Sequence, residues 1–483
     1  MLRGFLLCLG LSIGLLQPVF AQSVKVGEAE YFLAPKGSEK RPPDAAHRTP
    51  ALMAQAAPTN QWYSTLIFNA KPEAIYAQPL TVKATAPAFE IALPSKKVVP
   101  TFRKDVEIHY PHEEPLVFRP AAFAPDSSKL AKFSDWSIDI AMATGADSLI
   151  ATVTHGSPYV FFQLSRGDIH VALPDGANRV AGVGLPNQLV VDHKGKRYVV
   201  FAATGASWEV GAAGAWVGKL PQGKGYFTAA ALPDDKAATL ELFARHAYAF
   251  VQDTRVSWQY DQANSTVETL FSATTKAMEG SNTSTMMGLY PHHWHQNPLV
   301  ADRLGPAYDT VRGQIKTLVG NEFKTRRQYL GWVPFWPAVG AVQGAPDLKD
   351  VMAIDVRNAG RMMREGGDFP YWRGKGIMRV INMMNIADQQ GDAAARDRLL
   401  TLAKSEVEEW FAGKDRKTYF QYDAKLGTML SHPEQFFVIE QMNDHYFHYS
   451  YWIRAAAEIA LRDPDWASKS KWGGMVEIGR AHV

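Results

Sequence analysis

The spacing of apolar residues changes once along this chain, near Asp347, and this change constrains the fold more than any other feature. From about residue 23 to 270, short apolar runs such as 159–162 and 198–201 are separated by Gly, Pro, Asn and Asp. Short alternating runs bounded by such turn residues are typical of strands. Beyond Asp347 the apolar residues recur with helical spacing, as in Ile377, Val380, Ile381 and Met384. The sequence therefore predicts a β region followed by an α-helical region.

Three regions follow from this pattern, so we expect a multidomain β + α protein. The first is an N-terminal β-sandwich over residues 22–270, with helical spacing only in the Ala-rich stretch 237–249. A mixed segment at 271–345, which includes a Pro- and Trp-containing run at 331–337, is expected to form a small α/β linker domain. Residues 346–476 are expected to form at least four helices, with stops at Gly366-Gly367, Gly391-Asp392 and Asp463-Pro464.

The first 21 residues have the pattern of a secretory signal peptide. Arg3 supplies the positive charge, residues 5–16 the apolar stretch, and Val19-Phe20-Ala21 a cleavage site. We therefore expect a secreted or periplasmic protein. We expect no membrane association after signal removal, because no later stretch approaches about 18 apolar residues. The one cysteine, Cys8, lies in this segment, which excludes disulfides and Cys-based catalysis in the processed chain.

Charge and aromatic content narrow the class of partner. Lys and Arg total 51, Asp and Glu total 48, and no basic run stands out, so we expect no nucleic-acid partner. Aromatic residues make up 11% of the chain, and aromatic faces are suitable platforms for the apolar faces of sugar rings. The sequence therefore favours a neutral partner.

The densest group of polar and aromatic residues runs from Gln441 to Trp452, directly before an Ala-rich helical stretch. Asp444 stands where an N-cap residue would, and His448 follows four residues later, so both would share one face at the start of that helix. The helix dipole and His448 would favour the ionised carboxylate, so a general acid here requires a partly desolvated, substrate-filled cleft. The alternative is a capping Asp beside stacked aromatic residues.

Other chemistries fit these residues less well. Asp444, His445 and His448 lack the Glu that a zincin motif places between its two His residues. The adjacent His292 and His293 fit a Pro-bounded turn better than a metal site, and we expect no metal and no cofactor. We find neither a G-x-S-x-G elbow nor a phosphate-binding loop. The pair Tyr422-Asp423 either places a second carboxylate and an aromatic platform beside the cleft or forms a hairpin turn.

Several segments together resemble a known family. The most specific is Asn443-Asp444-His445-Tyr446-Phe447-His448-Tyr449-Ser450-Tyr451. With two substitutions it is similar to the Asn-Asp-His-His-Phe-His-Tyr-Gly-Tyr signature of glycoside hydrolase family 81, the secreted endo-β-1,3-glucanases. The resemblance extends along the chain through the segments 58–64, 75–80, 155–159, 289–293, 312–314 and 371–375.

This resemblance implies a fold, a reaction and a site. The fold would be an N-terminal β-sandwich, a small linking domain and a C-terminal (α/α)6 toroid present only in part. Asp444 would be the general acid of an inverting hydrolysis of internal bonds in β-1,3-glucans of the laminarin and curdlan type. The residues expected to bind this glucan are His448, His445, Asn443, Tyr449, Tyr422, Asp423, Trp372 and Lys375.

The C-terminus carries a further expectation. The family's general base lies in a motif further downstream, whereas this sequence ends at Val483. Residues 477–483 match the translation of a sequencing-adapter start, so we expect a non-native tail and a truncated, inactive catalytic domain. Two alternatives stay open. One is a non-catalytic β-1,3-glucan-binding protein, and the other is a polysaccharide lyase, for which the near-neutral charge offers little support.

Overall fold

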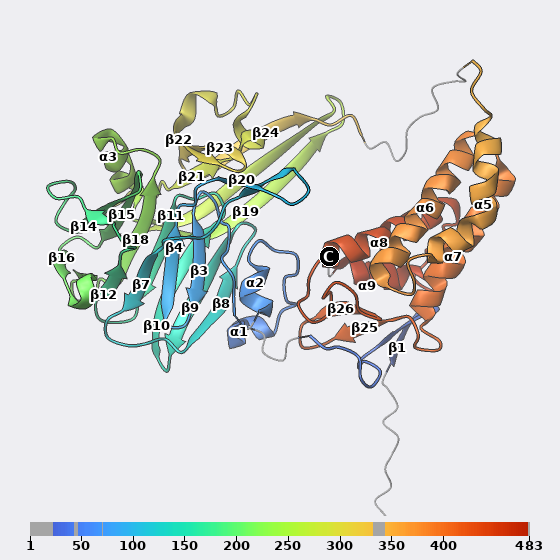
Figure 1. Cartoon of the computed structure of the whole chain (residues 1–483), viewed down its shortest axis with the longest axis horizontal. Coiled ribbons are helices and arrows are strands. Elements are labelled where there is room, and N and C mark those ends of the chain that lie inside the picture. The colour runs from blue at the N-terminus through green and yellow to red at the C-terminus, as the bar shows by residue number, and fades with distance from the viewer. Residues whose placement is uncertain (1–22, 43–46, 70, 332–342, 482–483) are drawn as a thin grey trace, which may run out of the picture. The chain divides into compact units, whose positions relative to one another are not determined.

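The computed structural model describes residues 23–42, 47–69, 71–331 and 343–481. They form two compact units (Figure 1). Residues 42–339 and 440–443 make up the sandwich unit, and the rest of the described chain makes up the helical unit. The predicted signal peptide at 1–21 and most of the run 331–337 lie outside the described residues. Among the helices described, none has the length and apolar character needed to span a bilayer.

The sandwich unit is built on two antiparallel sheets. The larger has the strand order β13-β14-β15-β18-β11-β10-β9-β8 and the smaller β16-β17-β12-β7-β4-β3. Phe162 of the larger sheet has its ring centroid 5.3 Å from that of Phe118 in the smaller sheet, so the inner faces pack through aromatic rings. The smaller sheet's strands are β3 (Thr81–Thr85), β4 (Ala88–Ala92), β7 (Leu116–Pro120), β12 (Ile169–Ala172), β16 (Ser207–Val210) and β17 (Trp216–Lys219).

The outer face of the larger sheet is covered as well. Tyr159 and Phe161 alternate with Phe162 along β11 and pack on the opposite side, against Phe243 of the helix α3 (Ala237–His246). The Tyr159 hydroxyl donates to the Phe243 carbonyl at 2.8 Å. This sheet contains β8 (Ser127–Phe133), β9 (Ser137–Thr144), β10 (Asp147–Thr154), β11 (Tyr159–Leu164), β13 (Asn178–Arg179), β14 (Gln188–His193), β15 (Lys196–Ala202) and β18 (Tyr226–Leu232).

These elements confirm the predicted strands and the predicted Ala-rich helix. The runs 159–162, 189–191 and 198–201 lie in β11, β14 and β15, and the stretch 237–249 contains α3. Their interior residues are buried because both faces of the larger sheet are covered. The sequence pattern was therefore sufficient for the core of this unit.

The predicted boundary between residues 270 and 271 differs from the structure. It falls inside β20 (Thr266–Ala277), which pairs with β19 (Ala249–Asp261) and β24 (Glu322–Gln328), so residues 271–339 belong to the sandwich unit. The change of sequence texture reflects short strands and turns within one unit. Its remaining elements are α1 (Pro50–Met53), α2 (Ser64–Phe68), β5 (Lys97–Pro100), β6 (Val106–His109), η1 (Ala212–Gly214), β21 (Met286–Leu289), α4 (Pro291–Trp294), η2 (Ala301–Arg303), β22 (Leu304–Thr310) and β23 (Gly313–Val319).

The helical unit has α6 at its centre, packed on α5, α7 and α8. The predicted apolar face of α6 is fully buried, and the Trp410 ring of α7 lies 4.7 Å from the Trp452 ring of α8. Pro370 occupies the first turn of α6, where its missing N–H costs nothing, and Gly413 ends α7 with φ 53°. The helices are α5 (Leu348–Arg364), α6 (Pro370–Gln389), α7 (Ala393–Ala412), α8 (His445–Arg462) and α9 (Gly473–Ala481).

Strands also contribute to the helical unit, which the sequence pattern did not predict. A hairpin of β25 (Tyr419–Asp423) and β26 (Thr428–His432) separates α7 from α8, and β2 (Ala29–Phe32), paired with β1 (Ser23–Val26), joins β25 in parallel. Residues 23–41 therefore belong to the helical unit and not to the sandwich predicted for 22–270. The predicted boundary at residue 476 falls inside α9, and the (α/α)6 toroid stays a prediction.

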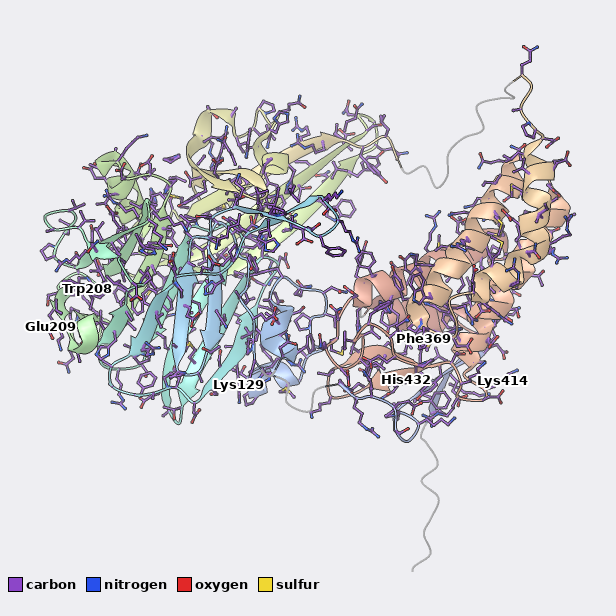
Figure 2. The ribbon with its side chains drawn as sticks, in the orientation of Figure 1. Lys129, Trp208, Glu209, Phe369, Lys414 and His432 are labelled. Carbon is purple, nitrogen blue, oxygen red and sulfur yellow. The ribbon has the colours of Figure 1, made fainter. Side chains whose placement is uncertain are left out.

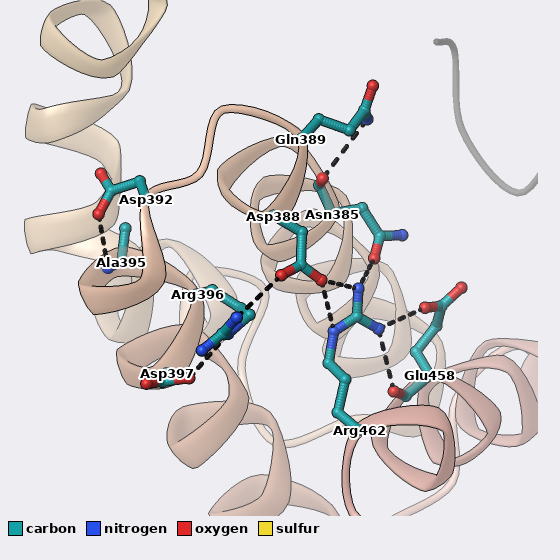
Figure 3. Close-up of polar contacts among 9 residues, drawn as sticks. All are labelled: Asn385, Asp388, Gln389, Asp392, Ala395, Arg396, Asp397, Glu458 and Arg462. Carbon is teal, nitrogen blue, oxygen red and sulfur yellow. Dashed lines mark hydrogen bonds and ion pairs between the residues drawn. The ribbon is translucent and has the colours of Figure 1, made fainter. Parts of the chain in front are cut away.

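Figure 3 shows the polar contacts that join three helix ends of this unit. The Arg462 guanidinium at the end of α8 donates to the Asp388 carboxylate at 2.9 Å and to the Asn385 amide oxygen at 2.7 Å, both on α6. Asp388 also pairs with Arg396 of α7 at 3.3 Å. These charged hydrogen bonds fix the ends of α6, α7 and α8 relative to one another.

Candidate active site

The polar and aromatic segment from Gln441 to Trp452 spans the start of α8. Asp444 is the N-cap residue, as predicted, but its backbone is left-handed with φ 52° and its side chain makes no capping hydrogen bond. Phe436, Phe437 and Met442, in the loop before it, also have positive φ. Non-glycine residues rarely adopt this conformation, and such strain is concentrated at functional sites. The capping interpretation of Asp444 therefore does not account for its exposed carboxylate.

His448 lies close to Asp444 on α8. Its backbone N–H donates to the Asp444 carbonyl at 3.0 Å, and its side chain is buried. Burial lowers the pKa of His448 to about 4, although the Asp444 charge acts to raise it. His448 is therefore neutral at pH 7. The expectation that His448 favours the ionised Asp444 carboxylate therefore receives no support from a charged imidazole.

Aromatic rings surround His448. We name Tyr371, Trp372, Lys375, Phe436, His448 and Tyr451 the Tyr371 cluster. The Tyr371 ring lies 5.4 Å from His448, 5.1 Å from Phe436 and 6.1 Å from Tyr451, measured between centroids. The Lys375 ammonium lies 4.9 Å from the centre of the Trp372 ring. Trp372 and Phe436 are exposed, so the cluster offers ring faces to a ligand.

The first turn of α6 holds Tyr371, Trp372 and Lys375 in place through a buried ion-pair network. Phe369, labelled in Figure 2, is the N-cap of this helix. The buried Arg373 pairs with Glu406 of α7 and with Asp368. Arg364 donates to the same Glu406 carboxylate at 2.9 Å. Because Glu406 is fully buried between two guanidinium groups, the network fixes the position and rotation of this turn.

Two glycines allow the aromatic residues of the cluster to pack closely. A Cβ on Gly366 would lie 2.4 Å from the Trp372 Cβ, and a Cβ on Gly374 would lie 2.9 Å from the Tyr451 Cβ. Any larger side chain at either position would displace its aromatic neighbour. Gly366, which the sequence predicted as a helix stop, therefore also leaves room for the Trp372 side chain.

The structure assigns structural positions to two of the predicted glucan-binding residues. The buried His445 makes a 2.8 Å hydrogen bond from Nε2 to the Val438 carbonyl, and thereby anchors the loop before α8. The buried Tyr449 donates from its hydroxyl to the Met429 carbonyl at 3.1 Å, which ties α8 to β26. Asn443 is exposed and is grouped with the sandwich unit.

Tyr422 and Asp423 are the last two residues of β25, directly before the turn of the β25–β26 hairpin. Asp423 accepts hydrogen bonds from the Leu426 N–H at 2.8 Å, through its carboxylate, and from the Gly427 N–H at 2.7 Å, through its carbonyl. The Tyr422 ring lies 5.9 Å from that of Tyr31. Of the two interpretations, the structure supports the hairpin turn, because Asp423 serves the turn itself.

Tyr371, Phe436 and Tyr451 are site residues that the sequence pattern did not predict. Tyr371 is adjacent to Trp372 and Tyr451 ends the segment that contains His448, and this proximity was the available signal. Phe436 lies in a loop without periodicity, so its place depends on the fold of residues 433–444. Within the described ranges, no three His, Cys, Asp or Glu side chains gather as metal ligands would.

Two cavities of the helical unit are lined by residues outside the Tyr371 cluster. One of about 280 Å³ is lined by residues of α5, α6 and α7 such as Met352, Val356 and Arg398. Another of about 360 Å³ lies near Glu408, Lys417 and Trp472. The Tyr371 cluster is instead an exposed aromatic surface beside the exposed Asp444 carboxylate.

Comparison with known proteins shows which family the chain resembles. Residues 344–477 match the Glycosyl hydrolase family 81 C-terminal domain. The chain is 35% identical over 434 residues to a glucan endo-1,3-beta-D-glucosidase of Acetivibrio thermocellus, covering 88% of this chain and 54% of that protein. It is 32% identical over 476 residues to a glucan endo-1,3-beta-D-glucosidase of Thermobifida fusca, covering 94% of this chain and 60% of that protein. The chain thus spans somewhat more than half the length of the curated relatives it matches.

The solved structures agree with this result. A glycoside hydrolase family 81 structure from Clostridium thermocellum superimposes with a TM-score of 0.84 at 33% identity, covering 95% of this chain and 63% of that one. The sequence similarity therefore extends to the fold of the sandwich unit and of the helical unit. On these matches, the chain is similar over most of its length to glycoside hydrolase family 81, whose C-terminal domain matches residues 344–477.

Proposed function

We propose that this protein acts on β-1,3-glucan and hydrolyses its internal glucosidic bonds. The observation that carries this proposal is the position of Asp444, an exposed carboxylate at the start of α8, next to the Tyr371 cluster. An exposed aromatic surface suits a long polymer better than a closed pocket would, because the polymer can bind along its length. The two relatives named as glucan endo-1,3-beta-D-glucosidases support the same substrate class.

In this proposal Asp444 is the general acid, which protonates the leaving glycosidic oxygen. A second carboxylate must activate water on the opposite face of the sugar, about 6.5–9.5 Å away for inversion. In the family that this chain resembles, the base lies in a motif that follows the Asn-Asp-His signature further along the chain. His448 is neutral at pH 7, because burial lowers its pKa to about 4, so it can donate or accept a hydrogen bond without adding a charge.

Trp372, Phe436 and Tyr371 would supply the stacking surface in this proposal, and Lys375 a hydrogen-bond donor to a sugar hydroxyl. Lys375 is exposed, and its ammonium group lies over one face of the Trp372 ring. The ammonium group therefore stays next to the aromatic surface. Arg373 and Glu406 would act only by positioning this turn.

Hydrolysis of laminarin tests the proposal directly, in a protein that contains both the residues described here and the family's base motif. We expect a ladder of oligosaccharides from the start of the reaction, and an initial α-anomer in proton NMR spectra because the bond is cleaved with inversion. Asp444→Asn should remove about 100-fold or more of the rate and leave laminarin affinity unchanged. Equal rates for Asp444→Asn and the wild type would refute the acid assignment.

A second candidate function is glucan binding without turnover, which the exposed rings of Trp372 and Phe436 favour because they can bind a sugar without a second carboxylate. It predicts that laminarin binds, that Trp372→Ala weakens binding, and that no products form. Products that absorb in the ultraviolet would instead indicate an unsaturated sugar and hence a lyase.

A further inference from the structure

Segments from three distant parts of the sandwich unit meet in a stack of aromatic and imidazole rings. The Trp62 ring lies 5.2 Å from His155, His155 stacks on Tyr290 at 5.4 Å with an interplanar angle of 21°, and Tyr290 stacks on His292 at 5.7 Å with 19°. These residues come from the start of α2, the β10–β11 turn and the β21–α4 junction. We name Trp62, His155, Tyr290, His292 and Arg312 the Trp62 cluster.

Backbone contacts hold the β10–β11 turn against Ala77 and against the β21–α4 junction. The Gly156 N–H, next to His155, donates to the Ala77 carbonyl at 2.7 Å. A Cβ on Gly288 would lie 2.1 Å from the Gly156 carbonyl oxygen, and Gly156 itself has φ 89°, so both positions require glycine. The rings of His155 and Tyr290 therefore stand on a rigid support formed by the backbone at Ala77, Gly156 and Gly288.

Two buried polar atoms near these residues make no hydrogen bond within the protein. Among the described residues, the Gln78 Oε1 and the Tyr110 hydroxyl have no hydrogen-bond partner, although the two side chains are 6% and 8% exposed. Tyr110 is close enough to Tyr290 for its charge to raise the Tyr290 pKa. Gln78 directly follows the Ala77 carbonyl that binds Gly156, and its backbone has φ 45°. An unpaired buried polar group is costly, so a ligand hydroxyl that satisfies it would bind favourably.

The charges of the cluster indicate the class of ligand. Burial is the largest cause of the shifts: it lowers the pKa of His155 to about 4, lowers the pKa of His292 and raises the pKa of Tyr290. The Arg312 cation acts to lower all three pKa values, so it lies near these side chains. At pH 7 the cluster therefore offers neutral imidazoles, phenols, an indole and a single guanidinium. This set suits a neutral polyhydroxylated ligand that combines hydroxyl groups with an apolar ring face, and not a polyanion.

The geometry points to a second β-glucan-binding site, formed by the Trp62 cluster entirely within the sandwich unit. The identity of the ligand rests on the proposed function. Trp62, which is half-buried, supplies the ring face, and Tyr76 adds an exposed ring one residue before Ala77. Gln78, Tyr110 and Arg312 supply hydrogen bonds to the sugar hydroxyls.

The test is the number of laminaritriose sites on the intact chain, measured by isothermal titration calorimetry in an Asp444→Asn background that prevents turnover. A trisaccharide is short enough to occupy one site at a time. We expect two sites, of which Trp62→Ala and Arg312→Ala each weaken one by about 3- to 10-fold, and Trp372→Ala weakens the other. Trp258→Ala, at a Trp 69% exposed on β19, is the matched control and should leave both sites unchanged.

The outcomes separate this inference from the proposed function. If Trp62→Ala and Arg312→Ala titrate like the control while Trp372→Ala loses binding, the second site is refuted and the proposed function stands. If the wild type melts cooperatively but binds no laminaritriose and no laminarin, both are overturned. Arg312→Ala keeps the test valid if Trp62→Ala unfolds, because Arg312 is exposed in a turn.

Discussion

Tyr371, in the first turn of α6, and His448, in the first turn of α8, lie with their ring centroids 5.4 Å apart. This contact brings two helix starts together and places the aromatic surface of α6 beside Asp444, the residue that precedes α8. The site therefore depends on the packing of α6 against α8 as much as on the motif itself. Substitutions in this packing, and in the groups that maintain it, should have measurable effects on stability.

Acid should destabilise the protein through its buried histidines. His448 has a pKa of about 4 when folded and an ordinary value of 6.5, so the unfolded chain binds more protons between these pH values and stability falls as the pH drops from 6.5 to 4. This group alone accounts for up to about 2 kcal/mol between pH 7 and pH 5. Urea unfolding at both pH values should show a smaller difference for His448→Gln than for the wild type. The exposed His170→Gln should leave the difference unchanged.

Removal of the Glu406 carboxylate should destabilise the first turn of α6, which carries aromatic residues of the Tyr371 cluster. The Glu406 carboxylate is fully buried and accepts from Arg373 and Arg364. Glu406→Ala therefore leaves the buried Arg373 guanidinium paired with the partly exposed Asp368 and without its buried partner, and should cost about 3–5 kcal/mol. Glu409→Ala removes a 49% exposed partner of the same Arg364 and should cost no more than about 1 kcal/mol. Thermal unfolding followed by circular dichroism measures both, and equal losses would contradict the assigned network.

Of the two aspartates that pair with Arg396 in Figure 3, Asp388 should be more sensitive to truncation than Asp397. It accepts from Arg462 and pairs with Arg396, so Asp388→Ala should cost about 1.5–3 kcal/mol. Asp397→Ala removes the same side chain from an exposed pair with Arg396 and should change stability by less than about 1 kcal/mol. Chemical denaturation midpoints at one pH compare the two variants. A larger loss for Asp397→Ala would disprove the proposed order.

Two helical glycines should respond in opposite directions to alanine. A Cβ on Gly376 of α6 would lie 2.1 Å from the Met363 carbonyl oxygen of α5, so Gly376→Ala should destabilise by about 1–3 kcal/mol. A Cβ on Gly360 of α5 meets only the Leu402 side chain at 3.8 Å, so Gly360→Ala should stabilise by about 0.5–1 kcal/mol. Melting temperatures test the sign of each change. A higher melting temperature for Gly376→Ala would show that the close approach of α5 and α6 is wrong.

Local sequence pattern was sufficient where burial follows a regular period. The strands around 159–162 and 198–201 and the apolar face of α6 were predicted because each places its side chains on a covered face at every second or every third to fourth residue. The Asp444 to Tyr451 segment was found as a candidate site because its composition differs from that of a core helix. Neither inference required knowledge of distant contacts.

Tertiary structure decided the features that depend on residues far apart in sequence. The pairing of β2 with β25, the continuation of the sandwich unit past residue 270, and the place of Phe436 beside His448 each arise from contacts without a local signal. Burial also decided the charge state of His448, which is neutral at pH 7. The sequence by itself determined the types of element and the chemical groups near Asp444. Only the packing of these elements determined which groups meet and which are neutral, because solvation and distance are properties of the folded chain.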